Sequence, residues 1–185
     1  VITGQSLVVK DRESFLEFML ATTREAEDYR QMIDDYYKIF QRSQSLTLED
    51  RKVLQKRILF LDNELVEFNK FKTYTQQKYL EERDAKRNAE RWIENIVNCS
   101  LDISKILLAS EHKEPPDTYK KVFLHLQFLP HFSQDLAETL MQWADLRNIL
   151  AHEYLDLRWQ QIKNFIDQSE IYWQKFLPVD WWRKG

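Results

Sequence analysis

An arginine, a histidine and a tyrosine lie within the eight residues Arg147-Asn148-Ile149-Leu150-Ala151-His152-Glu153-Tyr154. Histidine, with an unperturbed pKa of about 6.5, can accept and return a proton near neutral pH, which is what a general acid or base must do. Arginine keeps its charge, and its planar fork of donors matches a phosphate bidentately. It can also neutralise charge that develops in a transition state. The pair therefore suits the chemistry of phosphate esters.

The spacing of these residues limits how they can meet. At about 100° per residue, an uninterrupted helix would set Arg147 and His152 about 140° apart, too far to converge on one small group. Either the helix ends within the stretch, or two chains contribute to one site. His152 and Tyr154 would lie about 200° apart, so they share a site more easily at a turn or a helix end.

The pattern Arg-x4-His-x-Tyr, with Asn148 after the arginine and Leu155-Asp156 following, resembles the signature of the HEPN ribonucleases. It is most similar to the HepT-like toxins that are encoded beside a minimal nucleotidyltransferase (MNT) antitoxin. The resemblance extends over about two thirds of the chain. It includes the segments 56–71, 83–91, 102–103 and 115–119, which look like the family's successive helices and its proline-bearing loop.

This resemblance implies a metal-independent endoribonuclease that acts as a symmetric homodimer. His152 would transfer protons at the RNA 2′-hydroxyl or the leaving oxygen, and Arg147 would hold the phosphate. Two such motifs would face each other across the two-fold axis, which would also answer the problem of spacing. Tyr154 has two interpretations: a phenol that orients RNA or packs beside the site, or, as the resemblance implies, the hydroxyl to which the antitoxin attaches AMP.

Three further polar residues are candidates for binding or orienting the substrate. Asn148 could orient His152 or the phosphate through its amide, or it could be a helix C-terminal cap. Asp102 and Glu90 occupy family-like positions on the predicted long helix, where surface or structural roles are the alternative.

The composition predicts an all-α, up-and-down helical bundle. Two glycines and four prolines in 185 residues leave little turn chemistry for a β fold, and an aromatic content of 14% suits a well-packed core. The single cysteine, Cys99, excludes an internal disulfide and is expected in the core, which fits a reducing cytosol. Without an apolar run of about 18 to 20 residues or a signal pattern, a soluble cytoplasmic protein with no membrane partner is expected.

A formal net charge of -3 argues against a protein that coats nucleic acid without specificity. Two basic clusters, Lys52/Lys56/Arg57 and Arg83/Lys86/Arg87/Arg91, could still form local sites, or they could be ordinary solvated helix charges. The remaining histidines, His112, His125 and His131, show no metal-ligand spacing. Neither a metal nor a cofactor is predicted.

Three regions are expected along the chain: an N-terminal helical extension (1–50), the HEPN helical-bundle domain (51–177) and an aromatic C-terminal tail (178–185). Helices are predicted at about 12–41, 47–72, 80–110, 119–129, 134–150 and 158–176, with breaks at 74–78 and at Pro115-Pro116. Thr47-Leu48-Glu49-Asp50 resembles a capping box, and Ser133 is a predicted cap. The inward face of the long helix is predicted to carry Ala85, Ala89, Trp92, Ile93, Ile96, Val97, Ser100, Ile103, Ile106 and Leu107.

The sequence thus predicts the toxin of a toxin–antitoxin system, a ribonuclease that cleaves tRNA or mRNA and is neutralised by AMPylation of Tyr154 by a cognate MNT nucleotidyltransferase. The alternatives are a noncatalytic HEPN-like dimeric module that binds a nucleotide or a partner, and a purely structural helical adaptor. The roles of the extension and of the tail stay open: the first could lengthen the bundle or the dimer contact or bind the antitoxin, and the second could pack on its own bundle or anchor a partner.

Overall fold

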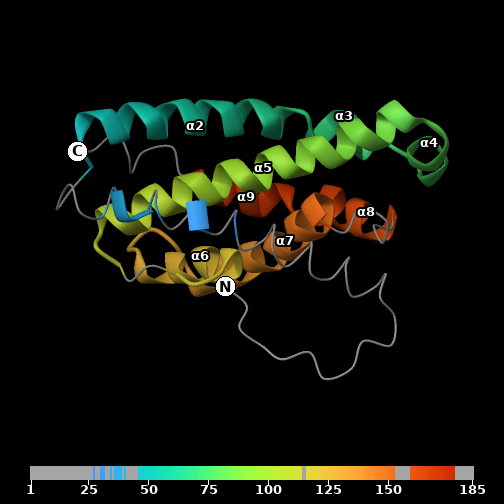
Figure 1. Cartoon of the computed structure of the whole chain (residues 1–185). Helices are drawn as coiled ribbons and strands as arrows, with labels where there is room; N and C mark the ends of the chain where they lie inside the picture. Colours follow the sequence, from blue (N-terminus) through green and yellow to red (C-terminus); the bar gives the residue numbers. More distant parts are fainter. Residues whose placement is uncertain are drawn as a thin grey trace, which may run out of the picture.

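The computed structural model describes residues 46–113, 116–152 and 159–177 and scattered positions between 27 and 40; for Ala151 and His152 it describes the backbone alone. Every regular element in these ranges is helical, which confirms the all-α prediction (Figure 1). Positions such as Glu27, Arg30 and Tyr36 are helical, but most of the predicted helix at 12–41 and the whole tail at 178–185 lie outside the described residues. None of the described helices is long and apolar enough to cross a membrane.

The first two described helices are α2 (Leu48–Val66) and α3 (Phe68–Lys72). Thr47 begins α2 through the predicted capping box, in which its hydroxyl accepts from the Asp50 amide at 3.1 Å. The prediction of one helix over 47–72 is wrong. The chain tightens at Glu67, whose amide donates to the carbonyl of residue 64 at 3.2 Å, three residues back rather than four.

A short helix, α4 (Gln76–Glu81), precedes the long helix α5 (Arg83–Ser110). The break predicted at 74–78 and the start predicted at 80 are therefore both wrong by a few residues. The physical reason is Thr75, whose hydroxyl accepts from the amide of residue 78 at 3.2 Å and so caps α4. The inward face predicted for the long helix is confirmed, because all ten of its residues are buried.

The end of α5 at Ser110 is confirmed, and it is unusual in its cap. His112 has φ 49°, the left-handed conformation that glycine normally supplies. The Lys113 amide donates to the carbonyl of residue 108 at 3.1 Å, as in a Schellman motif. The Lys113 carbonyl accepts from the hydroxyl of the fully buried Tyr36 at 2.6 Å, and Phe40 packs on the His112 ring at 5.1 Å. Tyr36 and Phe40 thus contact the residues that follow the end of α5.

Three elements follow the proline-bearing loop: α6 (Tyr119–His125), the 3-10 helix η1 (Leu126–Phe128) and α7 (Gln134–His152). The single helix predicted at 119–129 is thus an α-helix with a tighter last turn, ending before Pro130 as predicted. The Ser133 hydroxyl accepts from the amide of residue 136 at 3.2 Å, which confirms it as the cap of α7. The prediction that this helix ends at about residue 150 is short by two residues.

The last described helices are α8 (Trp159–Gln168) and α9 (Glu170–Phe176), which correct the prediction of one helix over 158–176. Ser169, which is fully buried, marks the division. Its carbonyl accepts both from Tyr172 at 3.0 Å and from Trp173 at 3.1 Å, so the chain tightens here as it does at Glu67.

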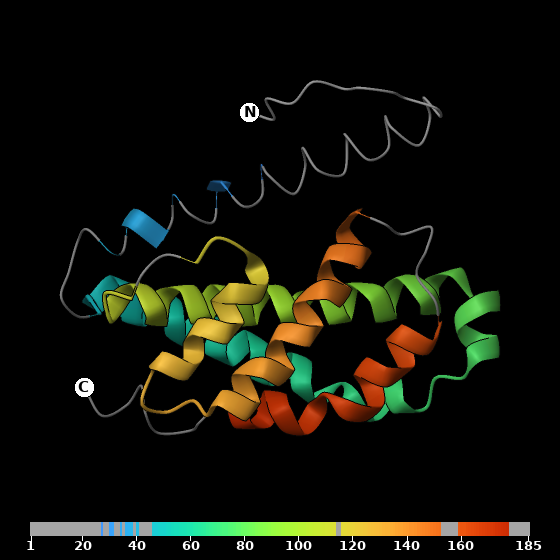
Figure 2. The same cartoon turned by 90° about the horizontal axis from the view of Figure 1, so that it is seen from below.

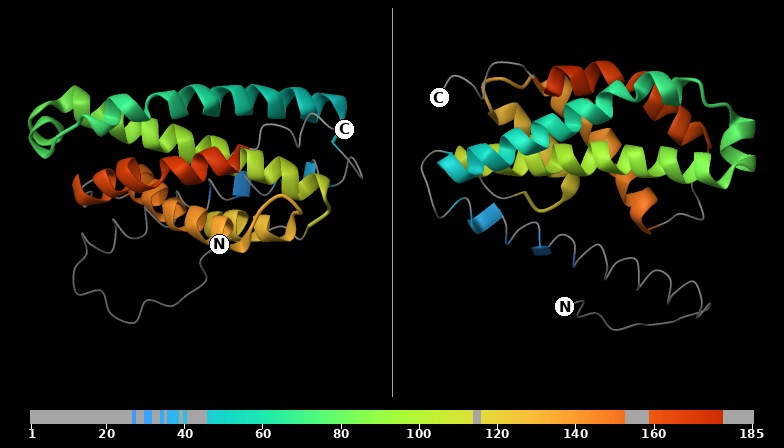
Figure 3. Two further views of the ribbon diagram at one scale, coloured as in Figure 1. Left: turned by 180° about the vertical axis from the view of Figure 1, so that it is seen from behind. Right: turned by 90° about the horizontal axis from the view of Figure 1, so that it is seen from above.

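The long helix α5 lies at the centre of the bundle, with α2 along one side and α6 and α7 along the other (Figures 1 and 3). Helix α7 crosses α5 obliquely, and the last turn of α7 projects past it (Figure 2). Helix α8 packs against α3, α4 and α5, and helix α9 packs against α2 and α7.

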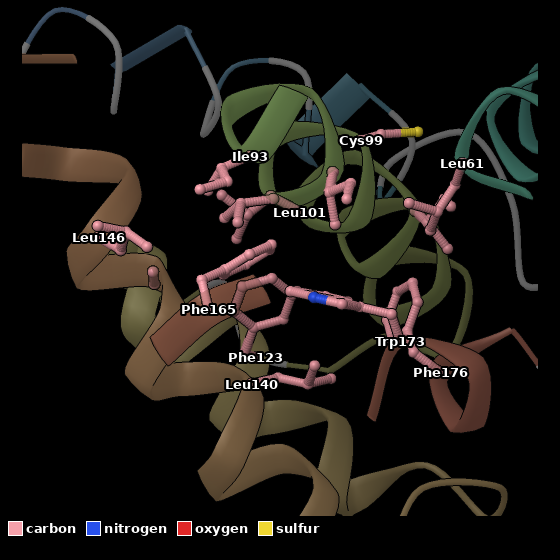
Figure 4. Close-up of a cluster of buried hydrophobic side chains, with 14 of the residues drawn as sticks. Leu61, Ile93, Cys99, Leu101, Phe123, Leu140, Leu146, Phe165, Trp173 and Phe176 are labelled. Atoms are coloured by element: carbon pink, nitrogen blue, oxygen red, sulfur yellow. The ribbon is translucent and has the colours of Figure 1, made fainter. Parts of the chain in front are cut away.

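Aromatic side chains fill the space between these helices (Figure 4). Phe165 of α8 packs on Trp173 at 6.2 Å between ring centroids, and Trp92 of α5 packs edge-on against both Phe165 at 5.8 Å and Phe68 at 4.7 Å. The Trp92 indole also donates to the carbonyl of residue 64 at 2.8 Å, which satisfies its one polar group. The predicted aromatic core is confirmed, and Cys99 is buried as predicted.

Candidate active site

Arg147 occupies a position of α7 that its apolar neighbours define as inward. Leu136, Leu140 and Ala144 follow one another at intervals of four residues on the buried face of α7, and residue 147 continues this stripe. Arg147 is accordingly only 8% exposed. A buried guanidinium requires polar partners, because an unpaired charge away from water is strongly destabilising.

Those partners come from two neighbouring helices and from α7 itself. The Arg147 Nε donates to Asn98 Oδ1 of α5 at 2.8 Å, and its Nη1 donates to Asn148 Oδ1 at 3.3 Å. The guanidinium carbon lies 4.7 Å from the centre of the Tyr119 ring of α6, a cation–π contact. These three contacts are all with neutral groups, and together they orient the guanidinium.

An ion pair between α6 and α7 supports this arrangement. Lys120 Nζ lies 2.7 Å from an Asp145 carboxylate oxygen, one residue after Tyr119 and two before Arg147. Both charged groups are about half exposed, so the pair contributes little stability by itself. The pair joins α6 and α7 close to the contact between Tyr119 and Arg147.

Helix α7 runs without interruption through His152, so the helix does not end between the two motif residues. Five residues turn a continuous helix by about 140°, and positions 147 and 152 therefore lie on different faces of α7. Asn148, which contacts Arg147, lies four residues before position 152 and thus on its side of the helix. Glu153 and Tyr154 lie outside the described residues, as do Leu155-Asp156.

Asp102 lies on α5 one turn after Asn98. Its Oδ2 accepts from Arg57 Nε of α2 at 3.2 Å and lies 3.1 Å from Arg57 Nη2, and its Oδ1 lies 2.7 Å from Lys105 Nζ. The carboxylate is thus the acceptor for two cations on the stretch of α5 that also holds Arg147. The buried Cys99 is close by: burial, reinforced by the Asp102 charge, raises the pKa of its thiol to about 12.

Glu90 lies farther away, eight residues before Asn98 and therefore about 12 Å along the helix axis. Its Oε1 accepts from the Tyr79 hydroxyl of α4 at 2.7 Å. Burial, followed by this hydrogen bond to Glu90, raises the pKa of Tyr79. Tyr79 also packs on Trp159 at 5.1 Å, at the start of α8. The described contacts of Glu90 are thus with Tyr79 of α4 and with Lys86 of α5, and not with Arg147.

Two residues of this site, Asn98 and Tyr119, were not predicted from the sequence. Asn98 is a half-buried amide in the long helix, beside a face that is otherwise apolar, and an amide at such a position needs a polar partner. The position of Asn98 therefore predicts a polar partner, but it does not identify which residue that partner is. Tyr119 follows the proline-bearing loop, and nothing in its spacing connects it with a residue 28 positions later.

A comparison with protein-family models found a match over most of the described helices. A protein-family model described as ribonuclease HepT-like matches residues 61–178, a range that contains α3 to α9 and the motif at 147–154. A search of curated proteins found no match. The matched range leaves out the N-terminal residues, including most of α2.

Proposed function

Because the chain belongs to the HepT-like ribonuclease family, we propose that it is a metal-independent endoribonuclease and the toxin of a toxin–antitoxin pair. The single observation that supports this most strongly is the Arg147 guanidinium, which is buried, held by two amides and stacked on an aromatic ring. These three contacts hold one cation of the motif that the family shares. Such support suits a residue that must bind a phosphate in a fixed orientation.

In the proposed reaction the RNA supplies its own nucleophile. The 2′-oxygen attacks the adjacent phosphorus and loses its proton, while the bond from phosphorus to the 5′-oxygen breaks and that oxygen gains a proton. His152 transfers one of these protons, and Arg147 stabilises the negative charge on the phosphoryl oxygens. The products are a 2′,3′-cyclic phosphate and a 5′-hydroxyl. DNA lacks the 2′-hydroxyl and is not a substrate.

We propose further that the active form is a symmetric homodimer. Positions 147 and 152 face different sides of one helix, so a single chain does not direct both toward one phosphate. A two-fold axis beside the end of α7 would bring position 147 of one chain toward position 152 of the other. In this proposal the last turn of α7, which projects past α5 (Figure 2), makes that contact.

Tyr154 is the proposed site of control by an MNT nucleotidyltransferase. AMP on its hydroxyl would add bulk and a negative phosphate two residues from His152, where it would compete with the RNA backbone for Arg147. The test is mass spectrometry of the tryptic peptide after incubation with ATP and the nucleotidyltransferase encoded beside the gene. An added AMP that disappears in Tyr154→Phe supports the proposal, and an unmodified peptide counts against it.

The test of ribonuclease activity compares three variants on total RNA. His152→Ala is expected to abolish cleavage while the circular dichroism spectrum and melting temperature stay close to those of the wild type. His125→Ala, a histidine on α6 that contacts Phe128, is the matched control and should cleave normally. Arg147→Lys keeps the charge but loses the fork of donors, and it should cleave at least tenfold more slowly.

Equal cleavage by the wild type and by His152→Ala would refute the proposal. It would instead favour the noncatalytic alternative, in which the motif binds an anion or a partner. Asn148 has a defined place in the proposed mechanism: it contacts Arg147 and lies one turn before His152, so it can orient either residue.

A further inference from the structure

The carboxylate of Asp102 holds two cations where one would balance its charge. Arg57 reaches it from α2, with Nε at 3.2 Å and Nη2 at 3.1 Å from Oδ2, and Lys105 lies on its other oxygen at 2.7 Å. By contrast, Lys72–Glu170 and Lys120–Asp145, which also join different helices, each match one cation with one carboxylate. The Asp102 cluster therefore carries an excess positive charge.

This cluster lies beside the residue that holds Arg147. Asn98 and Asp102 are four residues apart on α5, which places them about 40° apart around the helix and about 6 Å apart along it. Asn98 holds the Arg147 guanidinium from α7, and Asp102 holds Arg57 from α2. Cations from the two helices that flank α5 are thus held by residues one turn apart on α5.

The side chains of the cluster are also partly exposed to solvent. The side chains of Arg57 and Asp102 are 37% and 36% exposed, so an anion can approach the guanidinium without unfolding the contact. Lys105, at 15%, is more buried and is held firmly by its pairing. Of the basic cluster 52/56/57 in the sequence, Arg57 is the member that turns toward α5, whereas Lys52 and Lys56 are exposed on α2.

We propose that Arg57 and Lys105, held in place by Asp102, bind a phosphate of the RNA strand adjacent to the phosphate held by Arg147. This inference rests on the proposed ribonuclease function and extends it. RNA carries a phosphate at every nucleotide, so a strand whose scissile phosphate is at Arg147 presents its neighbours to the surface beside it. Asp102 acts as a positioning residue for the two cations and takes no part in proton transfer.

The test measures RNA binding in the His152→Ala background, so that the probe stays intact. A fluorescently labelled oligouridylate is titrated at several salt concentrations with the chain unchanged at other positions and with the double variant Arg57→Gln, Lys105→Gln. Losing this phosphate contact should lower the affinity about tenfold at low salt. The slope of log affinity against log salt should fall by about 0.7, the value for one phosphate contact on a single strand.

Two further variants make the result specific. Lys72→Gln removes one positive charge from an interhelical pair that joins α3 and α9. It should leave both the affinity and the salt slope unchanged. The exchange Arg57→Lys, Lys105→Arg keeps both charges and should keep the slope. The inference is overturned if the neutral double variant binds like its parent, if Lys72→Gln loses as much, or if the charge-conserving exchange loses the slope as well.

Failure of this subsite is distinguishable from failure of the proposed function. A wild-type chain that cleaves total RNA, and loses cleavage in His152→Ala, supports the ribonuclease whatever the salt slope of the double variant. A wild-type chain that neither cleaves total RNA nor binds the oligouridylate overturns both proposals together.

Discussion

The hydrogen bond between Arg147 and Asn98 allows a quantitative test of how the site is held. Its donor is charged and largely buried, and the Nε to Oδ1 distance is 2.8 Å. Hydrogen bonds of this kind contribute about 1.5–3 kcal/mol, and the cost of removing the acceptor includes the penalty of an unpaired buried donor. We therefore expect Asn98→Leu to lower the free energy of unfolding by about 2 kcal/mol, since Asn98 itself is only half buried.

A double-mutant cycle separates this contact from general disturbance of α5. The cycle combines Asn98→Leu with Arg147→Met, which keeps the apolar stem of the side chain and removes the charge. The coupling energy should be about 1.5 kcal/mol, because in the absence of Arg147 the change Asn98→Leu no longer leaves a buried donor without its acceptor. For a chain of 185 residues, the single Asn98→Leu change corresponds to a fall in melting temperature of roughly 4–8 °C.

The assay is urea unfolding followed by circular dichroism at one protein concentration, because dimerisation would make stability depend on concentration. Asn98→Asp is the matched control: it keeps an acceptor at the same place and should retain most of the wild-type stability. A coupling energy below about 0.5 kcal/mol would mean that the two side chains act independently. The argument that Asn98 holds Arg147 in place would then be refuted.

Two further predictions concern titratable groups that are partly or fully buried. Burial raises the pKa of Glu64 above its ordinary 4.5, and the hydrogen bond from Asn95 offsets this only in part. The charged carboxylate therefore destabilises the folded state above the folded pKa, and this destabilisation is absent below 4.5. Glu64→Gln should thus be more stable than the wild type at pH 7, and the gain should vanish near pH 4. The exposed Glu49→Gln on the same helix should give no such gain, and a gain that persists at low pH would contradict the reasoning. Burial raises the pKa of the Cys99 thiol to about 12. At pH 8 this thiol should therefore react with iodoacetamide about a thousandfold more slowly in the folded chain than in the urea-unfolded chain. Comparable rates would count against its burial.

Much of the fold follows from signals that act locally along the chain. The apolar residues of α5 recur at helical spacing over 28 residues, and this periodicity predicts its inward face residue by residue. Thr47 and Ser133 predict the starts of α2 and α7, since each hydroxyl satisfies an amide at a helix N-terminus. Such signals need no knowledge of the neighbouring helices.

The helix breaks at Glu67 and Ser169 could not be predicted in this way. Neither position is a glycine or a proline, and the apolar pattern continues across both. Tertiary packing provides the reason: the tightened turn at Glu67 lets Phe68 and Phe71 face Trp92, at 4.7 Å and 4.2 Å between ring centroids. The preference arises only when α5 is present, so the local sequence does not contain it.

The contacts of Arg147 illustrate the same limit at the site. The motif itself was readable, because the residue types and their spacing lie within eight positions of one another. Its support comes from Asn98 and Tyr119, which are 49 and 28 residues away and meet Arg147 only because α5, α6 and α7 pack together. The sequence therefore singled out the proposed reactive residues but could not identify the residues that orient Arg147.

The continuity of α7 through His152 leads to a complementation test of the composite site. If each site takes its arginine from one chain and its histidine from the other, a dimer of one Arg147→Met chain and one His152→Ala chain contains one complete site and one empty site. Random mixing makes half of the dimers mixed, so the mixture should recover about a quarter of wild-type cleavage although each variant alone is inactive. If Arg147 and His152 of the same chain worked together, every site in the mixture would lack one of the two and no activity would return. Mixing after mild denaturation and refolding, with cleavage of total RNA as the readout, distinguishes the two arrangements directly.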